Sequence, residues 1–254
     1  PYEFWLRYVV GLGTATDRNR ELQPPQYGSL VHEVLDRFAD SPALESADES
    51  ILRDAVRREL TRTTAERFGD GVAAAVKVQL LQIRERLDAF AAWQASWRAD
   101  GWRIEETETD FEERFELSGG RSIVVAGRID RIDHHPGTGV RAVLDYKTAD
   151  RSGKLESRHR GSAGWKDLQL IVYRLFLERR GKGHDLRIGY LNLSGEGTAI
   201  EPTWVELSPE EIEEGTRVLH ETLEAIVLGR FEPVDAIPRG EFGGYLVLGR
   251  EYPV

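Results

Sequence analysis

Hydrophobic residues change their spacing at Gly101, and this change constrains the fold more than any other feature of the chain. In residues 72–98, apolar side chains recur at intervals of three, four or seven residues: Val76, Leu80, Ile83, Leu87, Phe90 and Trp97. These intervals are typical of the packed face of a helix. After Gly101, segments with the two-residue period of strands are separated by glycine and proline. The sequence therefore predicts helices first and a sheet afterwards.

Local signals predict the other elements. Further helices are expected over residues 1–12, 28–39, 51–67 and 165–180, and strands over residues 102–117, 121–133, 140–147, 186–193 and 199–206. A last helix has Ser208 as its cap, Pro209 at its first position and Glu211 to complete a capping box. Pro24 and Pro25 are expected to break the chain. This order of elements is typical of a mixed α/β fold with a helical N-terminal part.

The length of 254 residues and a hydrophobic content of 40% are sufficient for a sizeable core. We expect residues 1–254 to form a single domain. In it, residues 28–100 form the helical part, residues 102–230 the α/β core and residues 231–254 an irregular tail. Pro1 is not a natural first residue, so we expect this chain to be part of a longer one.

Composition excludes some classes of protein. The chain has no cysteine, so disulfides and thiolate metal sites are excluded, and a cytoplasmic location is compatible with this. No apolar run is long enough to cross a membrane. Lys and Arg number 34 against 44 Asp and Glu, which gives a net charge of −10. This balance fits a soluble cytosolic protein, or an acidic active site that a metal bridges to a polyanion.

Two segments carry a group of residues that suits phosphate chemistry: VVAGRIDRID at 124–133 and VLDYKT at 143–148. Asp145 and Lys147 lie two residues apart in a strand, so they project from the same face. Antiparallel pairing of the two strands would bring Asp130 towards Asp145. Carboxylates bind Mg²⁺, and an ammonium group beside them can stabilise charge on a phosphate. An exposed salt bridge on a sheet face explains the spacing of Asp145 and Lys147 equally well.

These segments resemble the PD-(D/E)XK nuclease superfamily, in particular its RecB-like branch, which includes the nuclease domains of RecB and AddB. GRIDRID and VLDYKT match its two central motifs. QYGSLVHEVLDRF at 26–38 resembles the family's helix with a metal-binding histidine, DLQLIVY at 167–173 its Q-x-x-x-Y helix, and PYEFWLRYVVGL its N-terminal segment. The likeness is good over residues 1–175 and looser beyond. It implies a restriction-endonuclease-like fold, in which helices flank a mixed β-sheet.

The resemblance also implies roles for single residues. Asp130 and Asp145 would bind Mg²⁺ or Mn²⁺, with His32 and the backbone carbonyl of Tyr146 as further ligands. Lys147 would be the catalytic lysine. Two further roles follow: Gln169 and Tyr173 would line the site and touch the phosphate, and Glu108 would support the ligands. From the sequence alone, His32 could instead be an ordinary helix histidine, and Gln169 and Tyr173 a buried polar pair.

Residues 149–166 directly follow the catalytic strand and form a basic loop rich in glycine and serine. Its cations are Arg151, Lys154, Arg158, Arg160 and Lys166. We expect either that these residues bind DNA phosphates or that the loop is simply solvated. AddB-type relatives hold an iron–sulfur cluster with four cysteines. Because this chain has none, no such cluster is expected in it, and assignment to the AddB type is weakened.

The predicted function is that of a metal-dependent deoxyribonuclease, most simply an exonuclease of DNA recombination and repair. It would act alone or as the nuclease module of a helicase–nuclease, with DNA and a helicase as its partners, in the cytoplasm and without a membrane. A second hypothesis is an inactive nuclease-like domain that binds DNA or acts as a scaffold. A third is a nuclease that cuts RNA, since metal-assisted phosphodiester hydrolysis does not require a particular sugar.

Overall fold

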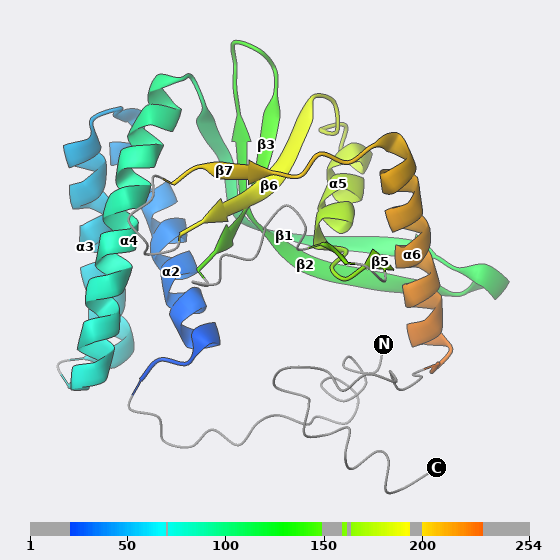
Figure 1. Ribbon diagram of the computed structural model, residues 1–254, viewed down its shortest axis with the longest axis horizontal. Helices are drawn as coiled ribbons and strands as arrows, with labels where there is room; N and C mark the ends of the chain where they lie inside the picture. Colours follow the sequence, from blue (N-terminus) through cyan, green and yellow to red (C-terminus); the bar gives the residue numbers. More distant parts are fainter. Residues whose placement is uncertain (1–20, 70, 149–158, 162–163, 194–199, 231–254) are drawn as a thin grey trace, which may run out of the picture. The chain divides into compact units, whose positions relative to one another are not determined.

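The computed structural model describes residues 21–69, 71–148, 159–161, 164–193 and 200–230 (Figure 1). The chain divides into two compact units. The larger unit comprises residues 19–113 and 126–215, and the described part of the smaller unit comprises residues 114–125 and 216–230. The helix expected over residues 1–12 and the tail expected over residues 231–254 lie outside the described residues.

Three helices form the first layer of the larger unit: α2 (Pro24–Ala39), α3 (Glu49–Phe68) and α4 (Ala74–Ala99). A 3₁₀ turn at Pro42–Glu45 joins the first two. α3 packs against both α2 and α4. Their buried apolar side chains form one cluster that includes Leu30, Leu52 and Phe90, as the helical period predicts.

The expected break at Pro24 and Pro25 is wrong, because α2 begins at Pro24. The first turn of a helix has backbone N–H groups without partners, so the missing N–H of proline costs nothing there, and its fixed φ suits the helix. The preceding residue, Gln23, donates its backbone N–H to Oε1 of Gln26 at 2.9 Å. The two prolines therefore start the helix.

The sheet has five strands: β1 (Arg103–Glu116), β2 (Ser122–His134), β3 (Arg141–Lys147), β6 (Leu186–Asn192) and β7 (Pro202–Trp204). Their order in space is β1-β2-β3-β6-β7. β2 and β3 are antiparallel, with Arg131 opposite Leu144, and β3 and β6 are parallel, with Asp145 opposite Tyr190. β6 and β7 are antiparallel. The expected mixed sheet flanked by helices is confirmed.

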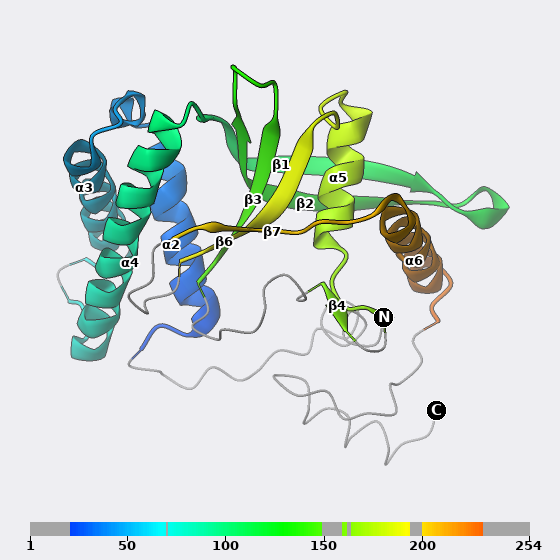
Figure 2. The same ribbon diagram turned by 45° about the horizontal axis from the view of Figure 1, so that its top comes forward.

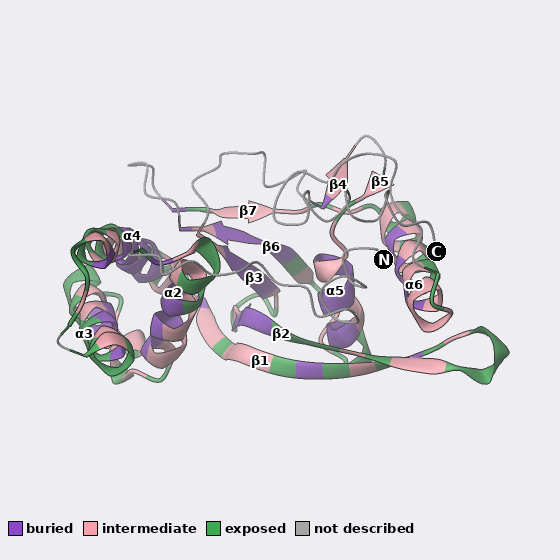
Figure 3. Cartoon of the chain, turned by 90° about the horizontal axis from the view of Figure 1, so that it is seen from below, coloured by how far each residue is buried: buried purple, intermediate pink, exposed green. Residues whose placement is uncertain are grey.

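The parallel pair needs a crossover, and helix α5 (Gln169–Arg179) lies in the chain between β3 and β6. In each ribbon view, α2–α4 lie on one side of β3 and β6, and α5 lies on the other (Figures 1–3). This double cover explains why residues 142–146 of β3 are all buried, without the alternation of a strand with one wet face (Figure 3).

The described chain also contains two short strands and a last helix. The strands β4 (Arg160–Gly161) and β5 (Gly164–Trp165) form a two-stranded antiparallel sheet, and α6 spans Pro209–Val227. The expected capping box is confirmed: Ser208 donates its N–H to Oε2 of Glu211 at 2.9 Å, and Glu211 donates its N–H to Oγ of Ser208 at 3.2 Å. Within the described ranges, no helix has both the length and the apolar character that crossing a bilayer requires.

Candidate active site

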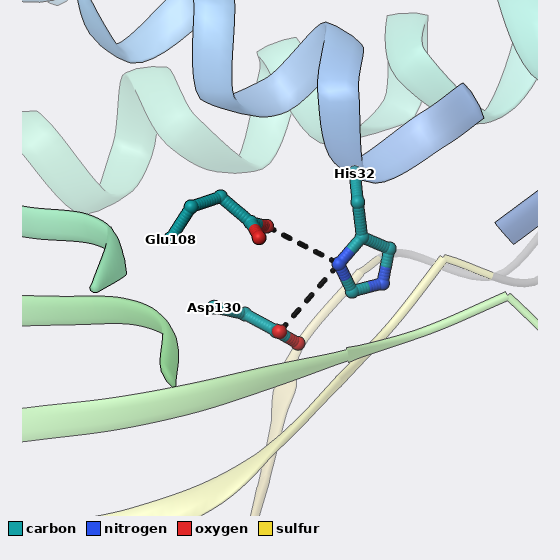
Figure 4. A group of neighbouring side chains, drawn as sticks. All are labelled: His32, Glu108 and Asp130. Atoms are coloured by element: carbon teal, nitrogen blue, oxygen red, sulfur yellow. Dashed lines mark hydrogen bonds and ion pairs between the residues drawn. The ribbon is translucent and has the colours of Figure 1, made fainter. Parts of the chain in front are cut away.

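Three side chains from three elements of the larger unit converge at one point: His32 of α2, Glu108 of β1 and Asp130 of β2 (Figure 4). Nδ1 of His32 lies 3.3 Å from Oε1 of Glu108 and 3.5 Å from Oδ1 of Asp130. One potential ligand atom from each residue lies within 4.8 Å of the other two. One imidazole nitrogen and two carboxylates at this separation form a donor set that could hold a metal ion.

His32 lies at the edge of the packed face of α2, where its ring is only partly buried. The ring meets the ring of Tyr146 edge to face, with 5.6 Å between the centroids. Tyr146 is buried in the core cluster, so its ring is a fixed surface for the imidazole. The packing of α2 on the sheet thus places Nδ1 of His32 towards the two carboxylates.

Glu108 has an unusual backbone. Its φ is 41°, in the left-handed region that residues other than glycine rarely adopt. Such a conformation costs on the order of 1 kcal/mol and is found disproportionately at functional sites. The surrounding strand therefore holds Glu108 in a strained conformation, with its carboxylate next to His32. The resemblance implied only a supporting role for Glu108, whereas the structure places its carboxylate in the group that could hold the metal ion.

Asp130 is 8% exposed, and its Oδ2 accepts the backbone N–H of Tyr146 at 2.7 Å. Burial, together with the charge of Asp145, raises the pKa of Asp130 to about 7. Burial lowers the pKa of His32, but its hydrogen bond to Glu108 and the charges of Asp130, Glu108 and Asp145 together raise it above its usual value. The repulsion between neighbouring carboxylates that contributes to the raised pKa of Asp130 is one that a bound cation would relieve.

Asp145 and Lys147 project from the same face of β3 and form an ion pair. Asp145 is 2% exposed, and its burial raises the pKa of the carboxyl even though Lys147 opposes the shift. The ammonium group of Lys147 also lies 5.4 Å from the ring centroid of Tyr190. Within the described residues, the cluster at His32 and Asp130 includes Glu108 rather than Asp145. The predicted ligand role of Asp145 remains a prediction.

Gln169 and Tyr173 share one face of α5 and contact each other. Nε2 of Gln169 donates to the hydroxyl of Tyr173 at 2.6 Å, and this hydroxyl donates to the backbone carbonyl of Arg128 at 2.8 Å. The chain of bonds ties α5 to β2 two residues before Asp130. Tyr173 is buried and Gln169 is half-buried. A contact of either side chain with phosphate remains a prediction.

Steric contact explains why the GRIDRID segment begins with glycine. A Cβ on Gly127 would lie 2.6 Å from the ring of Phe111 in β1. That ring in turn packs edge to face on Tyr173, with 6.0 Å between the centroids. Gly127 therefore lets Phe111 fill the space between β2 and α5 just before the site.

Of the basic loop, Arg151, Lys154 and Arg158 lie outside the described residues. Lys166 is exposed. Arg160 forms ion pairs with Glu211 and Glu214, and its guanidinium lies 5.2 Å from the ring centroid of Trp165. Its predicted contact with DNA would require these pairs to open, and the DNA-binding roles of Arg160 and Lys166 remain predictions.

A buried ion pair lies on β2, directly after Asp130 in the chain. Arg131 donates two hydrogen bonds of 2.7 Å to the carboxylate of Asp133, and both side chains are fully buried. Nε1 of Trp97 donates to the same carboxylate at 2.6 Å. Nη1 of Arg131 also lies 3.5 Å from the hydroxyl of Tyr146. Asp133 is therefore committed to the core rather than to the cluster at His32.

The chain matches a family model, several relatives in sequence and a solved structure. Residues 1–238 match the family model of the PD-(D/E)XK nuclease superfamily. The chain is 28% identical over 191 residues to one subunit of the ATP-dependent helicase/deoxyribonuclease of Acetivibrio thermocellus, and 25% identical over 192 residues to the corresponding subunit of Clostridium acetobutylicum. Each match covers 68% of this chain but 16% of the relative.

Solved structures include one of similar fold. It is a crystal structure from Eubacterium rectale that is described as a candidate exonuclease. The TM-score is 0.51 at 14% sequence identity, and the match covers 91% of this chain and 76% of the other. At this level of identity the likeness establishes the fold alone.

Proposed function

This chain belongs to the PD-(D/E)XK nuclease superfamily, and we propose that it is a metal-dependent nuclease that hydrolyses phosphodiester bonds in DNA. One observation carries the proposal: His32, Glu108 and Asp130 form a donor set for a metal ion. The family match makes phosphodiester hydrolysis the reaction that such a set would serve.

The donor set fits the ion that the family uses. Two carboxylates are the hard oxygen ligands that Mg²⁺ and Mn²⁺ prefer, and both ions keep sites for water and phosphate oxygens. We propose His32, Glu108 and Asp130 as the residues that hold the ion, with Asp145 and the backbone carbonyl of Tyr146 as further ligands. When bound, a divalent ion supplies a water of lowered pKa and neutralises charge on the phosphate.

The remaining residues of the site would stabilise charge on the substrate or hold strand β2 in place. The ion pair with Asp145 directs the ammonium group of Lys147 along the face that both residues share. From there, Lys147 would stabilise the negative charge that develops on the phosphate during attack by water. Gln169 and Tyr173 would fix the backbone of β2 next to Asp130.

The names of the relatives suggest the substrate and the setting. They are described as subunits of a helicase and deoxyribonuclease. We therefore propose that DNA is the substrate, that the chain degrades DNA ends as an exonuclease, and that it serves recombinational repair in the cytoplasm beside a helicase. The chain spans about one sixth of the length of these relatives, so the helicase partner is a proposal about the longer protein.

Digestion of end-labelled DNA tests this function. Linear and circular DNA, each single- and double-stranded, and RNA of the same sequence would be incubated with Mg²⁺, Mn²⁺ or EDTA. We expect cleavage of linear DNA with either ion and none in EDTA. Cleavage that persists in EDTA would refute the metal mechanism. Binding of DNA without cleavage in either ion would instead favour the inactive, DNA-binding alternative.

A further inference from the structure

Arg128 is a cation at the edge of the candidate site. The proposed function gives it no role. It lies on β2 two residues before Asp130, so both side chains project from the same face of the strand. Its side chain is 54% exposed. A nuclease needs positive charge near the scissile phosphate, and this chain has a net charge of −10.

The contacts of Arg128 place it next to Glu108, a member of the candidate metal cluster. Nη1 of Arg128 lies 3.7 Å from Oε2 of Glu108, whereas the other oxygen of Glu108 lies 3.3 Å from Nδ1 of His32. The guanidinium is held mainly by Asp110, through Nε at 2.6 Å and Nη2 at 3.3 Å. Arg128 therefore makes a two-pronged contact with a carboxylate beside the site.

The backbone and the side chain of Arg128 differ in how firmly they are held. Its carbonyl accepts the hydroxyl of Tyr173 at 2.8 Å, so the main chain is tied to α5. The carboxylate of Asp110, by contrast, is 75% exposed. An ion pair so open to water contributes little to stability and exchanges readily.

A phosphate can replace Asp110 with little rearrangement. The planar guanidinium presents parallel N–H groups that match two oxygens of a carboxylate or of a phosphate equally well. A phosphodiester carries the same charge as Asp110 and two free oxygens. On the basis of the proposed function, we propose that Arg128 binds a DNA phosphate adjacent to the scissile one, and that Asp110 holds Arg128 until DNA displaces it.

Four variants and one control test this exchange. They are Arg128→Gln, Arg128→Lys, Asp110→Asn, the double variant Arg128→Gln/Asp110→Asn, and Glu112→Gln, which removes an exposed charge from the same strand as Asp110. Binding of fluorescently labelled linear DNA would be measured at several salt concentrations with Ca²⁺ in place of Mg²⁺. Steady-state cleavage with Mg²⁺ or Mn²⁺ and melting temperatures would be measured on the same proteins.

We expect Arg128→Gln to weaken binding about tenfold and to reduce the slope of log K against log salt by about 1, because one phosphate contact is lost. In cleavage, KM should rise more than kcat falls. Arg128→Lys should lie between wild type and Arg128→Gln, since it keeps the charge but loses the fork. Asp110→Asn should bind DNA more tightly than wild type, because the competing carboxylate is gone.

The double variant distinguishes replacement of Asp110 by a DNA phosphate at Arg128 from simple repulsion between the carboxylate of Asp110 and DNA. If Asp110 acts through Arg128, Asp110→Asn will not tighten binding in the Arg128→Gln background, and Glu112→Gln alone will have little effect. Equal tightening by Asp110→Asn in both backgrounds would overturn the proposal. So would unchanged binding and salt slope for Arg128→Gln in a folded protein whose wild type cuts DNA. A wild type that neither binds nor cuts DNA would refute the proposed function instead.

Discussion

The backbone N–H of Tyr146 donates a hydrogen bond of 2.7 Å to Oδ2 of Asp130, and this bond joins β3 and β2 at the site. The other oxygen of Asp130 lies 3.5 Å from Nδ1 of His32. One carboxylate therefore links the two strands and contributes to the metal cluster. These two tasks can be separated by substitution.

Asp130→Asn should abolish cleavage and still fold. The amide oxygen of asparagine can accept the N–H of Tyr146, but the charge that a metal ion needs is gone. Since burial raises the pKa of Asp130 to about 7, its charge destabilises the metal-free protein at pH 8, and its removal should stabilise that protein by up to about 4 kcal/mol. Urea unfolding in EDTA and Mn²⁺-dependent cleavage would measure the two effects. A variant that is both active and less stable would contradict this account.

The metal-free protein should become more stable as the pH falls from 8 to 6. Asp130 and His32 both have raised pKa values, so over this range the folded state binds more protons than the unfolded state. Protons also compete with a metal ion for the same groups, so the gain in melting temperature that Mn²⁺ gives should shrink below about pH 7. Melting curves at each pH, in EDTA and in Mn²⁺, test both statements. The pH dependence should be smaller in Asp130→Asn, and an equal dependence would exclude Asp130 as its source.

The Glu108→Gly variant should be more stable than the Glu108→Ala variant. In most strand positions glycine is the less stable of the two, but the φ of 41° at Glu108 is strained for any residue with a Cβ. We expect Glu108→Gly to exceed Glu108→Ala in unfolding free energy by about 1 kcal/mol. Both variants, and Glu108→Gln, should bind Mn²⁺ more weakly than wild type. Calorimetric titration with Mn²⁺ measures this, and unchanged affinity would remove Glu108 from the metal site.

Asp133→Ala should destabilise the protein strongly. It leaves the fully buried guanidinium of Arg131 without its partner, which typically costs about 3–5 kcal/mol. The double variant Arg131→Met/Asp133→Leu should recover much of this loss, because no unpaired charge remains in the core. Chemical denaturation measures both. A mild effect of Asp133→Ala would mean that water reaches Arg131.

Tyr173→Phe distinguishes the two interpretations of the α5 residues. Loss of the hydroxyl leaves the carbonyl of Arg128 and the amide of Gln169 without their hydrogen bonds, which should cost about 1–3 kcal/mol of stability. If Tyr173 only positions β2, kcat should fall far less than in Asp130→Asn. A loss of kcat as large as that of Asp130→Asn, with unchanged stability, would instead favour direct contact with phosphate.

Local sequence was sufficient for features that depend on neighbours in the chain. The two-residue period of a strand places Asp145 and Lys147 on one face, and the capping box at Ser208 and Glu211 uses residues three apart. The change of period at Gly101 separates the helices from the sheet. In each case the interacting groups are fixed by the geometry of one element.

Tertiary structure decided which distant groups share a site. Glu108 joins His32, 76 residues earlier in the chain, through a φ that no motif encodes. Arg160, expected to face DNA, lies against glutamates more than 50 residues away. Such pairs form because the packing of the helices and strands fixes where each charged side chain lies. Each charge then pairs with an opposite charge that the fold places nearby. The sequence determined the elements and the motif, and the packing of α2, β1 and β2 determined the donor set.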